Sequence, residues 1–196
     1  MININDIRKP LRKPVHVNMY NGNLREYSLY NEEYYGPYNK KIDFNVFLES
    51  KGVNLQRPFV WTLKQKQELI LSILKGVDIP RFTVLIHENK DKTKILKIID
   101  GKQRLSTMID FMYDKFPIVI KGKEYVYSDF LSVKDCRQTY GENIKFILDS
   151  FAIHFNQVYS YWDDCFSDEE LIEWFEQINF SGTPQDEEHL KTLKNK

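Results

Sequence analysis

The most constraining feature of the sequence is a change of pattern between residues 95 and 112. Residues 95–99 are apolar except for one lysine and rich in isoleucine, which is typical of a buried strand. Asp100 and Gly101 then favour a turn. Apolar residues at helical spacing come next, namely Leu105, Met108, Ile109 and Met112. The segment therefore predicts a strand, a tight turn and a helix of about 102–113.

The start of this predicted helix is a candidate anion site. Lys102, Gln103 and Arg104 fall there, where exposed backbone N–H groups and the helix dipole attract anions. Arg104 adds a planar guanidinium that fits phosphate oxygens in a bidentate way. An Asp-Gly turn followed by a solvated arginine is the ordinary alternative. The residues alone leave both interpretations open, and a nucleotide is the ligand expected under the first.

Composition limits the class of protein. A chain of 196 residues with 42% hydrophobic and 14% aromatic residues can build a globular core, most simply as one domain. Its 28 basic and 28 acidic residues give a net charge of +0, so no global attraction to nucleic acid is expected. An export signal and a long apolar run are both missing, which predicts a cytoplasmic protein without a membrane span.

The chain divides into two predicted parts. Residues 1–40 carry three prolines and many tyrosines, and we expect an N-terminal arm with one short strand near residues 15–17. The basic residues between Arg8 and Lys13 could contact nucleic acid. Residues 41–196 form the predicted domain.

Helix and strand signals alternate irregularly along that domain. Capping boxes at Thr62 with Gln65 and at Ser167 with Glu170 predict two helix starts, and Gly76 predicts the end of the first helix. Strands are expected at 82–86, 95–99, 116–120, 124–127 and 151–158, a short helical pair at 129–149, a loop at 179–184 and a terminal helix at 186–194. The pattern predicts an α+β fold: a small mixed sheet with inserted and flanking helices.

Polar residues elsewhere in the chain could contribute to the same candidate site as the turn. Gln56 and Arg57 precede Pro58, which favours extended chain, and Arg57 could supply a second cation against phosphate. Asn179 could bind a base or ribose, and Glu188 or His189 could orient water or a metal. Helix ends explain this segment more simply, because Asn179 can close one helix and Thr183 or Asp186 can cap the next.

Taken together in this order, several segments resemble one known family. They are Gln-Arg-Pro-Phe-Val-Trp at 56–61, Ser-Ile-Leu-Lys-Gly with Ile-Pro at 72–80, Ile-Asp-Gly-Lys-Gln-Arg-Leu-Ser-Thr at 99–107, and an asparagine–glycine–glutamate motif within 175–188. The family is the N-terminal domain of GmrSD-type, modification-dependent (type IV) restriction endonucleases. The resemblance covers roughly residues 50–192.

This resemblance implies a compact fold shared with the N-terminal domain of ParB and with sulfiredoxin. It also implies binding, and in restriction enzymes hydrolysis, of a nucleoside triphosphate such as GTP or CTP with Mg²⁺, in order to control a nuclease. The implied nucleotide-binding residues are Gln56, Arg57, Gly101, Arg104 and Asn179, and we expect Lys102 to join them through its own charge. The implied catalytic residues are Asp100, Gln103 and Glu188, with Asp100 also holding the metal.

The sequence departs from the family pattern at two places. The family usually reads Asp-Gly-Gln-Gln-Arg, and Lys102 replaces the first glutamine. This lysine either strengthens phosphate binding or displaces a group needed for hydrolysis. Glu188 stands one position early in the last motif. Because sulfiredoxin chemistry needs a cysteine where Lys102 stands, we do not expect that activity.

Other functions stay open beside NTP binding. A nuclease signature of the histidine–asparagine–histidine type is missing, so we expect either a stand-alone regulatory domain or a separate nuclease chain, in bacterial defence or counter-defence. The alternatives are a ParB-like module that binds DNA or a partner without catalysis, and a small metal-dependent nuclease that uses Asp100 and Glu188. The expected partners are accordingly a nucleotide, DNA, a nuclease or a host defence protein.

Overall fold

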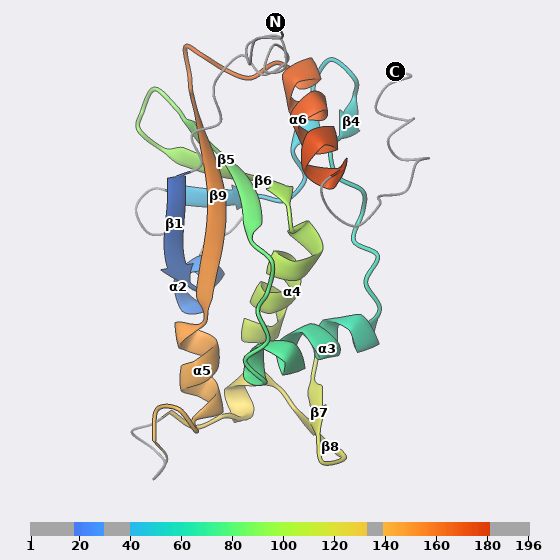
Figure 1. The fold of residues 1–196 in the computed structure, drawn as a ribbon, viewed down its shortest axis with the longest axis vertical. Helices are drawn as coiled ribbons and strands as arrows, with labels where there is room; N and C mark the ends of the chain where they lie inside the picture. Colours follow the sequence, from blue (N-terminus) through green and yellow to red (C-terminus); the bar gives the residue numbers. More distant parts are fainter. Residues whose placement is uncertain (1–17, 30–39, 133–138, 181–196) are drawn as a thin grey trace, which may run out of the picture.

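The computed structural model describes residues 18–29, 40–132 and 139–180 (Figure 1). They form a five-stranded sheet, two small two-stranded sheets and helices packed around them. In chain order the elements are β1 (Asn18–Asn23), α2 (Leu24–Ser28), β2 (Lys40–Asp43), β3 (Phe47–Leu48), β4 (Val53–Asn54), α3 (Leu63–Leu74), β5 (Phe82–Glu88), β6 (Lys94–Asp100), α4 (Lys102–Met112), β7 (Ile118–Ile120), β8 (Lys123–Tyr125), the 3₁₀ turn η2 (Tyr127–Asp129), α5 (Ile144–Ser150), β9 (Ala152–Tyr161) and α6 (Asp168–Phe180).

The main sheet is mixed, as the sequence predicts. Its strand order is β1-β9-β5-β6-β2. β5 and β6 form an antiparallel hairpin, whereas β9 runs parallel to β5 and β2 runs parallel to β6. The register of the hairpin shifts between Thr83 and Val84, close to the end of β6. This bulge lies next to the turn that begins α4, and bulges often redirect a chain beside a functional site.

Each face of the sheet has its own hydrophobic cluster. One cluster joins alternate residues of β5, β6 and β9 to α2, α3 and α4, and it includes Ile70, Ile98, Leu105 and Phe155. The other joins Leu85, Ile99 and Val158 to β3, β4 and α6. Because Ile98 and Ile99 are neighbours on β6, their side chains enter opposite clusters. The apolar run at 95–99 is therefore explained by burial on both faces.

Local sequence signals set the helix starts. Thr62 Oγ1 accepts from the backbone N–H of Gln65 at 3.4 Å, and the Gln65 side chain accepts from Thr62 N at 2.9 Å. Ser167 and Glu170 make the same reciprocal pair at the start of α6. Both predicted capping boxes are confirmed. Gly76, with φ of +73°, follows the end of α3 as predicted.

Several segments differ from the prediction. Residues 18–28, assigned to an arm from sequence, supply the edge strand β1 and the helix α2, because Leu24 and Tyr27 are buried in the core. A helical pair was expected at 129–149, but α5 is the helix that the described part of this region contains. α6 also continues through Phe180, past the predicted start of a loop at Asn179. The predicted strand at 15–17 and helix at 186–194 lie outside the described residues.

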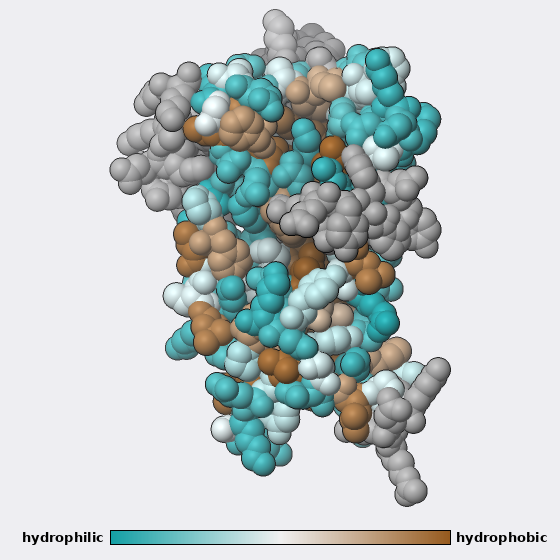
Figure 2. All heavy atoms as spheres, turned by 180° about the vertical axis from the view of Figure 1, so that it is seen from behind, coloured by the Kyte–Doolittle hydropathy of each residue, from teal (hydrophilic) through white to brown (hydrophobic). Residues whose placement is uncertain are grey.

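The surface mixes polar and apolar residues. On the face that Figure 2 shows, hydrophobic residues occur as separate patches among hydrophilic ones. Within the described ranges, the helices are too short or too polar to cross a membrane.

Burial of α2 gives a direct test of whether residues 18–29 belong to the domain. Leu24 is fully buried, so Leu24→Ala should lower the free energy of unfolding by about 2–5 kcal/mol. Leu29, which is 50% exposed, is the matched control, and Leu29→Ala should change it by less than about 0.5 kcal/mol. Urea unfolding followed by circular dichroism measures both. Equal stability of the two variants would show that α2 is not part of the core.

Candidate functional site

The turn between β6 and α4 depends on a glycine. Gly101 has φ of +95°, a left-handed conformation that side chains with a Cβ disfavour. A Cβ at this position would also overlap the ring of Phe82, the first residue of β5. The turn therefore passes directly against β5, and α4 begins at the end of the central hairpin. The strand, turn and helix predicted from residues 95–112 are confirmed.

The N-terminus of α4 is open to an acceptor. A glycine is its N-cap, and side-chain caps and acidic residues are both missing from its first turn. Within the described part of the chain, the backbone N–H groups of Gln103 and Arg104 have no acceptor. Uncapped N–H groups and the positive end of the helix dipole favour an anion at this place.

Arg104 does not point freely into solvent. Its guanidinium donates to the carbonyl oxygens of Pro80 and Arg81, the latter at 3.3 Å, and to Asp100 Oδ2 at 3.0 Å. It also lies over the ring of Phe82, 4.7 Å from the ring centroid. Burial lowers the pKa of Arg104 and the Asp100 carboxylate opposes that shift, but arginine stays protonated in proteins. Arg104 is thus a cation that ties α4 to the chain before β5.

Gln103 fastens a second segment to the same helix turn. Its amide oxygen accepts from the backbone N–H groups of Val60 and Trp61, at 3.0 and 3.3 Å, and its amide nitrogen donates to Pro58 O at 3.1 Å. Gln56 is buried and donates to the carbonyl oxygen of Ile98 on β6. These two glutamines hold the extended segment 56–61 beside the turn.

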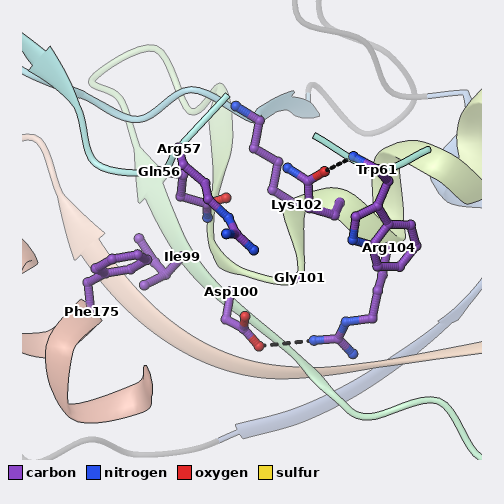
Figure 3. A pocket seen from close by; sticks show the side chains of 10 residues that line it. Gln56, Arg57, Trp61, Ile99, Asp100, Gly101, Lys102, Arg104 and Phe175 are labelled. Atoms are coloured by element: carbon purple, nitrogen blue, oxygen red, sulfur yellow. Dashed lines mark hydrogen bonds and ion pairs between the residues drawn. The ribbon is translucent and has the colours of Figure 1, made fainter. Parts of the chain in front are cut away.

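Arg57 lies between Gln56, which is bonded to β6, and Pro58, which is bonded to Gln103. It is half-buried, and among the residues that the structure describes it makes no hydrogen bond or ion pair. In Figure 3 its guanidinium points toward Asp100 and Gly101, while Arg104 reaches Asp100 from the other side. The Lys102 side chain extends away from Asp100, and its ammonium contacts Asn45 Oδ1 at 3.0 Å. Arg57 is therefore the cation aimed at the turn.

These residues line one pocket, which we call the α4 pocket. It has a volume of about 150 Å³, enough for phosphate groups but below the roughly 300–1,000 Å³ of most pockets that enclose a whole ligand. Its lining is Gln56, Arg57, Trp61, Ile99, Asp100, Gly101, Lys102, Gln103, Arg104 and Phe175. Three of these side chains are cations and one is a carboxylate, an excess of two positive charges in a chain of net charge +0.

The structure brings together seven of the nine predicted site residues. Gln56, Arg57 and the run from Asp100 to Arg104 all line the α4 pocket. The side chain of Asn179 and the whole of Glu188 lie outside what the structure describes. In the described ranges, no group of three histidine, cysteine or acidic side chains could hold a metal ion. A metal here would therefore need ligand oxygens beyond those of Asp100.

Sequence reasoning missed three participants. Trp61 and Phe175 pack against the hydrophobic clusters, as their residue types favour, and in addition both line the α4 pocket. Asn45, which holds the Lys102 ammonium, carries no local signal because it lies 57 positions away in the chain. The proline at position 58 biases Arg57 toward extended chain but gives no indication of where the Trp61 side chain lies.

Comparison with known families decides the affiliation. Residues 53–194, which are 142 of the 196 residues, match the family described as GmrSD restriction endonuclease, N-terminal domain. The chain belongs to this family. No curated protein and no solved structure matched the chain. The match to the GmrSD N-terminal domain includes the whole α4 pocket and begins after β1, α2, β2 and β3.

The glycine of the GmrSD-type turn is open to a stability test. Gly101→Ala adds a Cβ both in a left-handed conformation and against Phe82, so it should lower the free energy of unfolding by about 2–4 kcal/mol. Gly76→Ala is the matched control, because Gly76 has φ of +73° but open space around its Cβ, and about 1 kcal/mol is expected. Thermal and urea unfolding provide the comparison. A Gly101 variant no less stable than the Gly76 variant contradicts the close approach to β5.

Proposed function

We propose that this chain binds a nucleoside triphosphate and that the α4 pocket receives its phosphate groups. The observation that carries the proposal is the excess of cations over carboxylates in a pocket that also contains an uncapped helix N-terminus. Backbone N–H groups, guanidinium and ammonium groups are the donors that bind phosphate most strongly. This local excess of cations is not a consequence of overall charge, since the chain has a net charge of +0.

Arg57 supports this proposal most directly. A half-buried guanidinium without a carboxylate partner in the described structure loses hydration and gains no compensating ion pair. A phosphate placed beside the N–H groups of Gln103 and Arg104 would supply that partner. Gln56 and Gln103, by fixing segment 56–61 on both sides, hold Arg57 ready for this contact.

The size of the pocket limits what it can hold. At about 150 Å³ it accepts phosphate groups, so the ribose and base would lie at its mouth. Trp61 is half-buried and lines the pocket, which makes its ring available to stack on a base or a ribose. Stacking does not select among bases, so GTP and CTP both fit this part of the proposal.

Asp100 fits a role in holding Mg²⁺ together with the nucleotide. Its Oδ2 accepts from Arg104, whereas its Oδ1 has no hydrogen bond within the described part of the chain. Mg²⁺ is commonly held by one or two carboxylates, phosphate oxygens and water, so a single protein carboxylate is sufficient. The ion would neutralise phosphate charge in binding and in any hydrolysis.

Hydrolysis is the second part of the proposal and needs a group that orients water. In the present arrangement the Gln103 amide is bonded to the backbone of Pro58, Val60 and Trp61, which makes it a positioning residue for the pocket wall. Water orientation would then fall to Glu188, as the family resemblance implies. Through such binding the domain would control a nuclease, DNA contact or a host defence protein in a restriction system, in the bacterial or infected cytoplasm.

Calorimetric titration with each of the four NTPs and Mg²⁺ tests the proposal. At least one NTP should bind, and Arg57→Gln should weaken its affinity about 10- to 100-fold, because a charge-assisted bond contributes about 1.5–3 kcal/mol. Arg25→Gln is the matched control: it removes an exposed ion pair with Asp149 and should leave affinity unchanged. No binding by any NTP, or equal affinity of the Arg57 variant and the wild-type protein, would contradict the phosphate site.

A further inference from the structure

Arg104 lines one cavity and is hydrogen-bonded to residues that line another. It lines the α4 pocket, and its hydrogen bonds end on Pro80 and Arg81. Those two residues line a second cavity of about 690 Å³, which we call the loop groove. The lining of the loop groove is Ile73, Gly76, Val77, Asp78, Ile79, Pro80, Arg81, Ile147, Phe151, Ala152 and His154. One side chain therefore joins the candidate phosphate site to a larger and mostly apolar cavity.

The segment that Arg104 holds forms one wall of the loop groove. Residues 77–81 connect α3 to β5 without regular secondary structure, and most of them are exposed. The backbone N–H of Val77 bonds to Ser72 O at 3.0 Å at one end. At the other end, Arg104 bonds two consecutive carbonyl oxygens and stacks on Phe82. The position of this wall thus depends on where the Arg104 guanidinium lies.

A phosphate competes for the same guanidinium. The carbonyl oxygens of Pro80 and Arg81 are neutral acceptors, whereas phosphate oxygens carry negative charge and can bind a guanidinium in a bidentate way. A phosphate in the pocket would lie near this guanidinium, because Arg104 lines the α4 pocket and belongs to the first turn of α4. Phosphate charge in the pocket favours a guanidinium turned away from the two carbonyls.

We propose that Arg104 is a latch, closed on Pro80 and Arg81 when the α4 pocket is empty and released when phosphate groups fill it. This inference rests on the proposed function, since it needs a polyphosphate in the pocket. Release frees the 77–81 segment and changes the shape of the loop groove. Coupling between two sites requires an element with two arrangements that each site can favour, and the latch with its segment is such an element.

Hydrogen–deuterium exchange of the full chain tests the latch. The probe is inorganic triphosphate with Mg²⁺, followed by whichever NTP binds most tightly, each at a saturating concentration set by calorimetry. Peptides that cover residues 77–82 should exchange at least threefold faster with the probe bound. Peptides from the β5–β6 turn at 89–93 should be unchanged, because that turn is closed by its own hydrogen bonds.

Three variants test whether the Arg104 side chain itself controls exchange at residues 77–82. Arg104→Lys keeps the charge but cannot bond two carbonyls and stack on Phe82 together, so residues 77–82 should exchange fast without the probe and gain little with it. Arg57→Gln should match the wild-type protein without the probe, and at the same probe concentration should show a smaller increase because it binds less. Lys92→Gln, which breaks an exposed ion pair with Glu88, is the control and should behave as the wild-type protein throughout.

The outcomes distinguish the two proposals. Binding measured by calorimetry together with unchanged or slower exchange at 77–82 overturns the latch and leaves the phosphate site standing. No binding of triphosphate or of any NTP overturns the phosphate site and the latch with it. If Arg104→Lys does not fold, the comparison of wild-type protein with and without the probe decides the question alone.

Discussion

The contact of Gly101 with the ring of Phe82 determines where everything else in the site can lie. Without a Cβ, the turn after β6 passes against β5 and sets the first turn of α4 at the end of the hairpin. Phe82 in turn supports the Arg104 guanidinium on its face. The backbone N–H groups, the Asp100 carboxylate and the arginine are consequently gathered within one helix turn. A larger residue at position 101 would move α4 and separate these groups.

Within the α4 pocket, the polar side chains divide into anchors and groups that face the pocket. Gln56, Gln103 and Arg104 make hydrogen bonds to backbone atoms of other segments, so they hold the walls together. Arg57 makes no such bond in the described structure, and it faces the turn. Preorganised donors bind an anion at little entropic cost, because their supports are already in place. The anchors Gln56 and Gln103 on either side of Arg57 are consistent with a segment 56–61 that is in place before any ligand arrives.

The sequence predicted features that depend on neighbouring residues, and it missed contacts between segments that are far apart in the chain. Capping boxes, the Asp-Gly turn and the strands near 82–86 and 95–99 depend on neighbours a few residues apart, so patterns in the chain reveal them. The backbone partners of the Gln103 and Arg104 side chains lie 23 to 45 positions away, and no periodicity encodes them. Residue types therefore identified the α4 pocket, but could not show that two of its side chains hold segments together. The placement of α2 was missed for a related reason, since its buried Leu24 and Tyr27 stand in a polar and tyrosine-rich stretch.

Both edges of the main sheet come from the first 43 residues, ahead of the segment that matches the GmrSD N-terminal domain. β1 covers β9 on one side and β2 covers β6 on the other. A fragment cut at residue 53 would keep the α4 pocket and lose both bordering strands, exposing rows of unsatisfied N–H and C=O groups along β9 and β6. Bare sheet margins of this kind recruit other chains and lead to aggregation. β1 and β2 thus protect the edges of the sheet, and the family segment expressed alone would be prone to aggregate.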